Sequence, residues 1–296
     1  MTRDAVAFEL NRDRIAVPGG GIAVLRFGRA GAPPLLFAHA NGFCASAYRQ
    51  MLEHLGPRFD VYAVDLRGHG RTSLPTDRKG LRGLDIFGAD IGALLTAIRA
   101  KSNIGAPWTL SGHSLGAVAV TLAAVGRADV AALRLVEPVA MPQAWYWAAR
   151  TPFWPLIAWR LPLVAGARKR RAAWPDRASV LASYSKKPLF ASWASGVLED
   201  YLSDGLDVTA AGASLSCAPS WEAANFAAQA HDFWGAAKKA PAPIAVLAAR
   251  HPSSTTPPSS IRRFRRLGAE IVLIDGVSHL APFENPAAVA GFLAGA

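Results

Sequence analysis

A serine with glycines on either side lies in the pentapeptide Gly-His-Ser-Leu-Gly at 112–116. The apolar run at 108–110 predicts a short buried strand, and the Ala/Val-rich run that follows the pentapeptide predicts a helix. A serine on a sharp strand-to-helix turn has strained dihedrals, so the residues two positions away must be small. Such a turn lifts the Ser114 hydroxyl above the sheet and points the first helix amides toward the same region. The pattern favours a nucleophile over a glycine-rich turn that merely contains serine.

A serine hydroxyl is a weak nucleophile and needs a base within hydrogen-bond reach. His279 is the candidate, because it lies on the loop after the last predicted strand and before the final predicted helix. The other histidines differ in position: His113 is inside the serine turn, His39 and His69 belong to other strand-end loops, and His251 lies in a Pro-rich loop.

These residues need a scaffold, and the chain alternates apolar strand-like runs with helical patterns. We expect a hairpin at 14–17 and 22–27, strands at 34–38, 59–64, 108–111, 132–136, 244–247 and 271–274, and helices at 47–55, 85–100, 258–267 and 285–293. Alternation of this kind predicts a mostly parallel sheet covered on both faces. Ligands bind at the carboxyl ends of the strands in such sheets, and the candidate residues fall at those ends.

The alternation stops between residues 140 and 236. Eight of the nine tryptophans lie in this segment, with many prolines and no strand-like run. We predict a mostly helical cap at 140–236 that is inserted into a core domain formed by residues 1–139 and 237–296, and that closes over an apolar substrate cleft. Most of the tryptophans are expected to be packing anchors, while Trp145 and Trp147 are candidates for substrate contact.

The composition restricts the class of protein. A hydrophobic content of 51% over 296 residues is ample for a large buried core. The formal net charge is +11, but the basic residues are scattered and no nucleic-acid motif accompanies them. The densest basic runs, 168–171 and 262–266, are interpreted as solvated faces. We expect no nucleic-acid partner.

Cys44 and Cys217 are far apart and give neither a disulfide framework nor a metal-ligand spacing. Met1–Asp4 lack the apolar run of a signal peptide, and the apolar run at 152–167 is broken by Pro155, Arg160 and Pro162. We therefore expect a cytoplasmic protein without stable membrane insertion, metal or other cofactor. The sequence leaves the oligomeric state open.

Three motifs occur in order: the serine pentapeptide, Asp-x-Arg-Gly-x-Gly-x-x-Ser at 65–73, and Gly-x-x-His-Leu-x-Pro-x-Glu-x-Pro at 276–286. Together they resemble the α/β-hydrolase-fold serine hydrolases of the esterase and lipase type, over nearly the whole chain. The resemblance implies a mostly parallel eight-stranded sheet that is flanked by helices and carries an inserted cap. It also implies an oxyanion hole made by two backbone amides.

The first oxyanion amide is that of Leu115. The second depends on how His39-Ala40-Asn41-Gly42-Phe43 is aligned with the His-Gly-Phe of the family. Matching Gly42-Phe43 selects Phe43, our choice, and counting from His39 selects Asn41. Asn41 and His113 are also candidates for substrate contact.

The acid is where the sequence departs from the family pattern. Members usually carry it after the seventh strand, but the corresponding loop at 248–258 has no carboxylate. A subset places it after strand six, where Glu137 stands, next to the nucleophile strand. Asp275 is the alternative, although it precedes His279 by four residues and is expected to belong to a turn. Another use of Glu137 would be to bind backbone amides at the entrance of the cap.

The resemblance implies hydrolysis of a small-molecule carboxylic ester, with an apolar acyl or alkyl part, through an acyl-enzyme formed on Ser114. Serine in place of aspartate at the turn argues against dehalogenase or epoxide-hydrolase chemistry. Two alternatives stay open: another reaction of the fold, such as C–C bond hydrolysis or perhydrolysis, and a ligand-binding member without catalysis.

Overall fold

The computed structural model describes residues 11–102 and 104–295, so Met1–Asp4, discussed above, lie outside it. Within these residues one sheet has eight strands in the order β1-β2-β4-β3-β5-β6-β10-β11. Their bounds are β1 Asn11–Val17, β2 Gly20–Gly28, β3 Pro34–Ala38, β4 Asp60–Val64, β5 Trp108–His113, β6 Val130–Val136, β10 Ile244–Ala249 and β11 Glu270–Ile274. Pairing is antiparallel for β1 with β2 and β2 with β4, and parallel elsewhere. The prediction of a mostly parallel eight-stranded sheet is confirmed.

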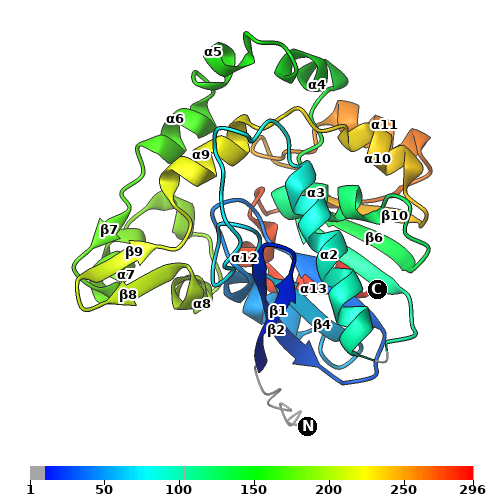
Figure 1. Ribbon diagram of the computed structural model, residues 1–296, viewed down its shortest axis with the longest axis horizontal. Helices are drawn as coiled ribbons and strands as arrows, with labels where there is room; N and C mark the ends of the chain where they lie inside the picture. Colours follow the sequence, from blue (N-terminus) through cyan, green and yellow to red (C-terminus); the bar gives the residue numbers. More distant parts are fainter. Residues whose placement is uncertain (1–10, 103, 296) are drawn as a thin grey trace.

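Strands β3 and β10 are apolar throughout because helices cover both faces of the sheet. In β3, Leu36 and Ala38 belong to one buried cluster, whereas Leu35 and Phe37 belong to the cluster on the opposite face. The first face is covered by α2 (Asp85–Lys101), α3 (Leu115–Ala124), α10 (Phe233–Lys239) and α11 (Pro258–Arg266). The second is covered by the 3-10 turn η1 (Ala45–Tyr48) and by α1 (Arg49–Glu53), α12 (Ala281–Glu284) and α13 (Pro286–Ala294). Figure 1 shows α2 and α3 lying across the front of the sheet.

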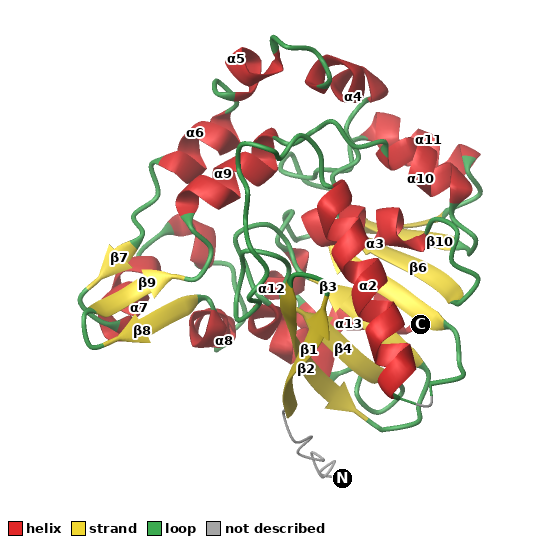
Figure 2. Ribbon diagram, viewed as in Figure 1, coloured by secondary structure: helices red, strands yellow, loops and turns green. Residues whose placement is uncertain are grey.

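The segment between β6 and β10 is mostly helical. It contains α4 Gln143–Ala149, α5 Trp154–Ala158, α6 Pro162–Arg168, α7 Arg177–Tyr184, η2 Pro188–Phe190, α8 Val197–Asp204 and α9 Pro219–Ala227. The expectation that it holds no strand is wrong. β7 (Ala173–Trp174), β8 (Leu206–Thr209) and β9 (Gly212–Leu215) form a small antiparallel sheet in the order β7-β9-β8, drawn in yellow at the left of Figure 2. Strands of two to four residues are too short to show an alternating pattern in the sequence.

Part of this insertion shares a core with the main sheet. Trp193 and Tyr201 contact Phe43 with ring centroids 5.8 and 5.3 Å away, and Trp193 contacts Phe283 at 4.5 Å. Helices α4 to α6 pack differently, because their buried side chains form two small clusters with residues of α9 and its flank. The division into core and cap at residues 139 and 237 stays a prediction, since the buried core continues across it.

Candidate active site

The serine turn is shaped by two close contacts. Ser114 has φ of +55°, in the left-handed region that non-glycine residues rarely adopt. A Cβ on Gly112 would lie 2.4 Å from the carbonyl carbon of Gly116, and a Cβ on Gly116 would lie 2.0 Å from the carbonyl oxygen of Ala38. Both glycines are therefore required, because α3 starts against the turn and against the end of β3. Parallel β3 and β5 pair Ala38 with Gly112, which brings the loop after β3 beside Ser114.

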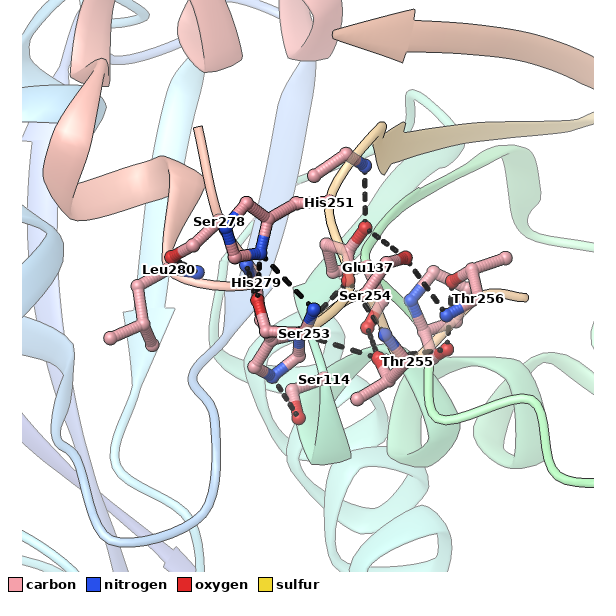
Figure 3. A network of polar contacts seen from close by, with 12 residues as sticks. Ser114, Glu137, His251, Ser253, Ser254, Thr255, Thr256, Ser278, His279 and Leu280 are labelled. Atoms are coloured by element: carbon pink, nitrogen blue, oxygen red, sulfur yellow. Dashed lines mark hydrogen bonds and ion pairs between the residues drawn. The ribbon is translucent and has the colours of Figure 1, made fainter. Parts of the chain in front are cut away.

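The structure brings together Ser114, His279 and Glu137 (Figure 3). The Nε2 atom of His279 lies 3.2 Å from Ser114 Oγ, and its Nδ1 atom lies 3.0 Å from Glu137 Oε2. Their elements explain the meeting: Ser114 follows β5, Glu137 follows the neighbouring parallel strand β6, and His279 lies after β11. With a proton on Nδ1 facing the carboxylate, the lone pair of Nε2 faces the hydroxyl, as a general base requires.

Glu137 is fully buried, and the last residue of β10 together with the loop after it surrounds the Glu137 carboxylate with donors. Oε1 accepts from the Ala249 N–H at 2.6 Å and from Ser254 Oγ at 2.8 Å, and Oε2 accepts from the Thr255 N–H at 2.9 Å. Burial by itself raises the pKa of Glu137, but His279 and the N–H donors of Ala249 and Thr255 outweigh it, so the pKa lies below its ordinary value. The carboxyl group is an anion at neutral pH.

Strain marks the same two residues. Among the described residues, the non-glycine residues with positive φ are Ser114 at +55° and Glu137 at +47°. Backbone strain of this kind costs about 1–3 kcal/mol each and persists where the surrounding structure imposes it. Strain at both ends of the Ser–His–Glu chain supports a shared functional requirement.

Asp275 lies elsewhere. Its side chain is 78% exposed, and its partner is the Arg250 guanidinium at 3.6 Å. His279 makes its carboxylate contact with Glu137 instead. The alternative acid is therefore not at the site.

The Phe43 amide is not available as the second oxyanion donor. Its N–H donates to the carbonyl oxygen of Ala40 at 3.2 Å within the loop turn. Within the described residues, the N–H groups of Asn41 and Leu115 have no protein acceptor. The hydrogen bond to Ala40 contradicts the choice of Phe43. Asn41, the alternative alignment, is therefore the second predicted donor, and Leu115 stays the first.

The loop that carries Asn41 is held from all sides, and the histidines weighed as alternative bases do part of this work. His69 Nε2 accepts from the Gly42 N–H at 3.1 Å, and His39 Nε2 accepts from the Leu66 N–H at 2.9 Å. Burial lowers the pKa of His69 to about 4 and also lowers that of His39. Both are neutral structural residues.

His113 positions the base. It is fully buried, its Nδ1 accepts from the Tyr48 hydroxyl at 2.7 Å, and its Nε2 donates to the carbonyl oxygen of His279 at 2.8 Å. The same Tyr48 hydroxyl accepts from the Ala40 N–H at 3.0 Å. This chain of hydrogen bonds connects the oxyanion loop with the backbone of His279. The prediction of a substrate contact for His113 is wrong, because the ring is enclosed by these partners.

The side chain of Asn41 is also committed to the protein. Its amide donates to the carbonyl oxygen of Glu222 at 2.9 Å, and its oxygen accepts from Asn225 Nδ2 at 2.9 Å. Both partners belong to α9, so this helix fixes the loop after β3 through Asn41. A substrate contact by the Asn41 side chain is not supported; its backbone N–H is the group that remains free.

Trp145 and Trp147 lie on α4, at the top of the molecule in Figure 1. Trp145 packs edge-on against Trp154 at 5.6 Å, and Trp147 is 62% exposed and packs against Tyr146. The structure does not bring either ring to Ser114. Whether a tryptophan is packed or exposed depends on how its helix is rotated about its axis. When apolar residues occur on all faces of a helix, the sequence does not reveal this rotation.

Sequence reasoning missed the residues that support the contacts among Ser114, His279 and Glu137. Tyr48, Ser254 and Thr255 form the contacts described above, and Ser253 Oγ accepts from the His279 N–H at 3.0 Å. The Ser/Thr-rich composition of residues 253–256 was the available signal for these contacts. A loop that has no carboxylate of its own but binds one from another element must provide hydrogen-bond donors.

Comparison with known proteins agrees with this geometry. The model of the alpha/beta hydrolase family matches residues 35–292. The chain belongs to the alpha/beta hydrolase family. A curated relative in sequence is 3-oxoadipate enol-lactonase 2 of Acinetobacter baylyi, 30% identical over 84 residues. That match covers 28% of this chain and 30% of the relative, so it spans less than a third of the enol-lactonase.

Alpha/beta hydrolases of known structure match over nearly the whole chain. The crystal structure of E-2-(acetamidomethylene)succinate hydrolase has a TM-score of 0.76 with 18% identity and covers 94% of this chain and 95% of its own. A thermophilic esterase from Thermogutta terrifontis has a TM-score of 0.64 with 20% identity and covers 95% of each chain. At these identities the likeness shows the fold.

Proposed function

We propose that this alpha/beta hydrolase is a serine hydrolase that cleaves carboxylic esters through an acyl-enzyme. The observation that carries the proposal is the continuous contact from Glu137 Oε2 through the His279 ring to Ser114 Oγ, at 3.0 and 3.2 Å. A ligand-binding protein without catalysis would not need a buried anion behind a histidine that faces a strained serine.

Each step of the reaction has a group to perform it. His279 Nε2 takes the hydroxyl proton as Ser114 Oγ attacks the ester carbonyl carbon, and Glu137 stabilises the resulting imidazolium. The N–H groups of Leu115 and Asn41 hold the oxyanion. The imidazolium then gives the proton to the leaving alkoxide, which departs as an alcohol. Water, deprotonated by the same nitrogen, then attacks the acyl carbon. The bond to Ser114 Oγ breaks, the imidazolium returns its proton to this oxygen, and the carboxylic acid is released.

The apolar part of the substrate is proposed from Phe43, in the loop after β3. The rings of Trp193, Tyr201 and Phe283 are buried and pack against Phe43, which itself stays partly exposed. An exposed phenyl surface suits an acyl or alkyl chain rather than a charged group. The enol-lactonase and the esterase among the relatives are also named for cleavage of ester-type bonds.

The test uses an active-site probe and a substrate series. A fluorophosphonate should label Ser114 stoichiometrically, and Ser114→Ala should remove both labelling and hydrolysis of p-nitrophenyl esters. Turnover that depends on acyl length and disappears in Ser114→Ala supports the proposal. Absence of both labelling and turnover would favour the non-catalytic alternative, and turnover that survives in Ser114→Ala would contradict the assignment of the nucleophile.

A further inference from the structure

The outer surface of α4 to α6 exposes large apolar side chains. We define the apex patch as Trp147, Phe153, Leu156, Ile157, Trp159 and Leu163, each between 49% and 69% exposed. Six of the eleven large hydrophobic residues that are exposed in the described part of the chain lie in this short stretch. Large exposed apolar patches mark interaction surfaces.

The inner surface of the same helices is already in use. Trp154 and Ala158 are buried, and Trp154 Nε1 donates to the carbonyl oxygen of Ala227 at 2.7 Å. Val164 and Ala167 of α6 are buried against the α9 region. The helices are thus apolar on both sides while only one side packs on the protein. A helix that is apolar all round is normally covered, so the outer side requires a partner.

The charged residues of the chain segment that carries the apex patch are all basic. Between Glu137 and Asp176 the chain has no acidic residue, and its basic residues are Arg150, Arg160, Arg168, Lys169, Arg170 and Arg171. Arg170 is turned inward and binds Glu222, while the other five are exposed. The Arg168 guanidinium lies 3.4 Å from the centre of the Trp159 ring, so cation and aromatic ring are presented together. The partner must accept apolar side chains and positive charge at once.

We propose that the apex patch docks on the surface of an anionic lipid bilayer. Its apolar side chains would enter the boundary between headgroups and acyl chains, where tryptophan is favoured, and the flanking cations would contact lipid phosphates. Within the described residues no helix could cross a membrane, and α4 to α6 have five to seven residues each, so the protein lies on the surface. A second copy of the chain is a poorer partner, because it would bring like charges together.

Vesicle sedimentation tests the proposal with the whole chain at low ionic strength. We expect binding about tenfold or more tighter to vesicles of equimolar phosphatidylglycerol and phosphatidylcholine than to pure phosphatidylcholine. Added salt should weaken it, because screening reduces the attraction of the exposed cations. Equal binding to both vesicles, or no binding to either, would overturn the proposal.

Variants locate the surface. Phe153→Ser with Leu156→Ser should weaken binding to the anionic vesicles about tenfold or more. The matched control, Leu189→Ser with Val208→Ser, removes apolar side chains of similar exposure outside the apex patch and should bind as the unmodified protein does. An equal loss in the control would refute the location.

A second pair serves if the apolar variant unfolds. Arg160→Glu with Lys169→Glu changes exposed positions only and should also weaken binding to the anionic vesicles; unchanged binding would contradict the role of charge. A concentration-dependent dimer that Phe153→Ser with Leu156→Ser abolishes would instead identify a second copy as the partner and overturn the proposal. Hydrolysis of a water-soluble p-nitrophenyl ester reports separately on the proposed function.

Discussion

Glu137→Gln is the substitution that examines the site most closely. Every contact of the carboxylate comes from a donor: the N–H groups of Ala249 and Thr255, the Ser254 hydroxyl and His279 Nδ1. A glutamine has one oxygen and one amide nitrogen, and the nitrogen cannot accept. If its oxygen keeps the contacts at 2.6 and 2.8 Å with Ala249 and Ser254, its nitrogen must face the other two donors.

Two effects follow, and their magnitudes differ. The amide nitrogen favours the His279 tautomer that carries its proton on Nε2. In this tautomer Nε2 has no free lone pair to accept the hydroxyl proton of Ser114. We expect kcat/KM to fall by about two to four orders of magnitude, which corresponds to about 2.7–5.4 kcal/mol. The unsatisfied Thr255 N–H costs about 1–3 kcal/mol of folding free energy, so Tm should fall by about 2–4 °C for each kcal/mol.

Hydrolysis of a p-nitrophenyl ester and thermal unfolding, each measured on the same sample, separate the two effects. Asp275→Asn is the control, because it makes the same chemical change at an exposed carboxylate and should leave both quantities near those of the unmodified protein. A larger loss of kcat/KM in Asp275→Asn than in Glu137→Gln would refute the assignment of the acid. A mild loss in both would mean that Glu137 only binds the loop amides.

Three further predictions follow from the same structure. Ser114→Ala and His279→Ala should lose activity to a similar extent, and the double variant should be no slower than either single one, because the residues act as a unit; a multiplicative loss of kcat would contradict this. Gly116→Ala should reduce the free energy of unfolding in urea or abolish folding, since the added Cβ would lie 2.0 Å from the Ala38 carbonyl oxygen at the end of β3. The control is Gly166→Ala in α6, where the added Cβ meets open space; it should be neutral or stabilising by up to about 1 kcal/mol. Burial raises the folded-state pKa of Asp65 to about 6, so its protonated form is favoured by folding and its contribution to stability is lost as pH rises through that value. The free energy of unfolding in urea, taken relative to that of Asp65→Asn, should therefore rise by about 1.4 kcal/mol when the pH is lowered from 7.5 to 5. A difference that does not change with pH would contradict the raised pKa of Asp65.

The features that the sequence predicts well are those with local causes. The turn at Ser114 is determined by two neighbouring glycines and by the strand and helix patterns on either side of it, and strands β3 and β10 are continuous apolar runs. Glu137 could be singled out because the loop at 248–258, where the family usually carries the acid, lacks a carboxylate. In addition, adjacent strands in a parallel sheet end at the same edge. Its distance to His279 falls in hydrogen-bond range, while its catalytic role stays a prediction.

Features that depend on distant partners could not be predicted. The choice between Asn41 and Phe43 rests on one turn hydrogen bond, from Phe43 N–H to the carbonyl oxygen of Ala40, inside a loop with two residues more than the family pattern. The enclosure of His113 depends on the Tyr48 hydroxyl, 65 residues away in the chain. The exposure of Trp147 depends on which side of α4 packs against the neighbouring helices. None of these is visible from residue type and spacing alone.

The position in the chain of the hydrogen-bond donors to Glu137 affects when the site can form during synthesis. The glutamate follows β6, but its donors come from the end of β10 (Ala249) and from the loop after it (Ser254 and Thr255), more than a hundred residues later in the chain. A ribosome-bound chain that ends before residue 244 already has the serine turn, yet it has neither His279 nor any of these donors, and β6 still lacks its neighbour β10. An unpaired sheet edge and an unsatisfied carboxylate both disfavour a compact state. On the proposed function, the nascent protein is therefore inert as a hydrolase until the loop after β11, which carries His279, has been synthesised. Chaperone contacts during synthesis should concentrate on the exposed edge of β6.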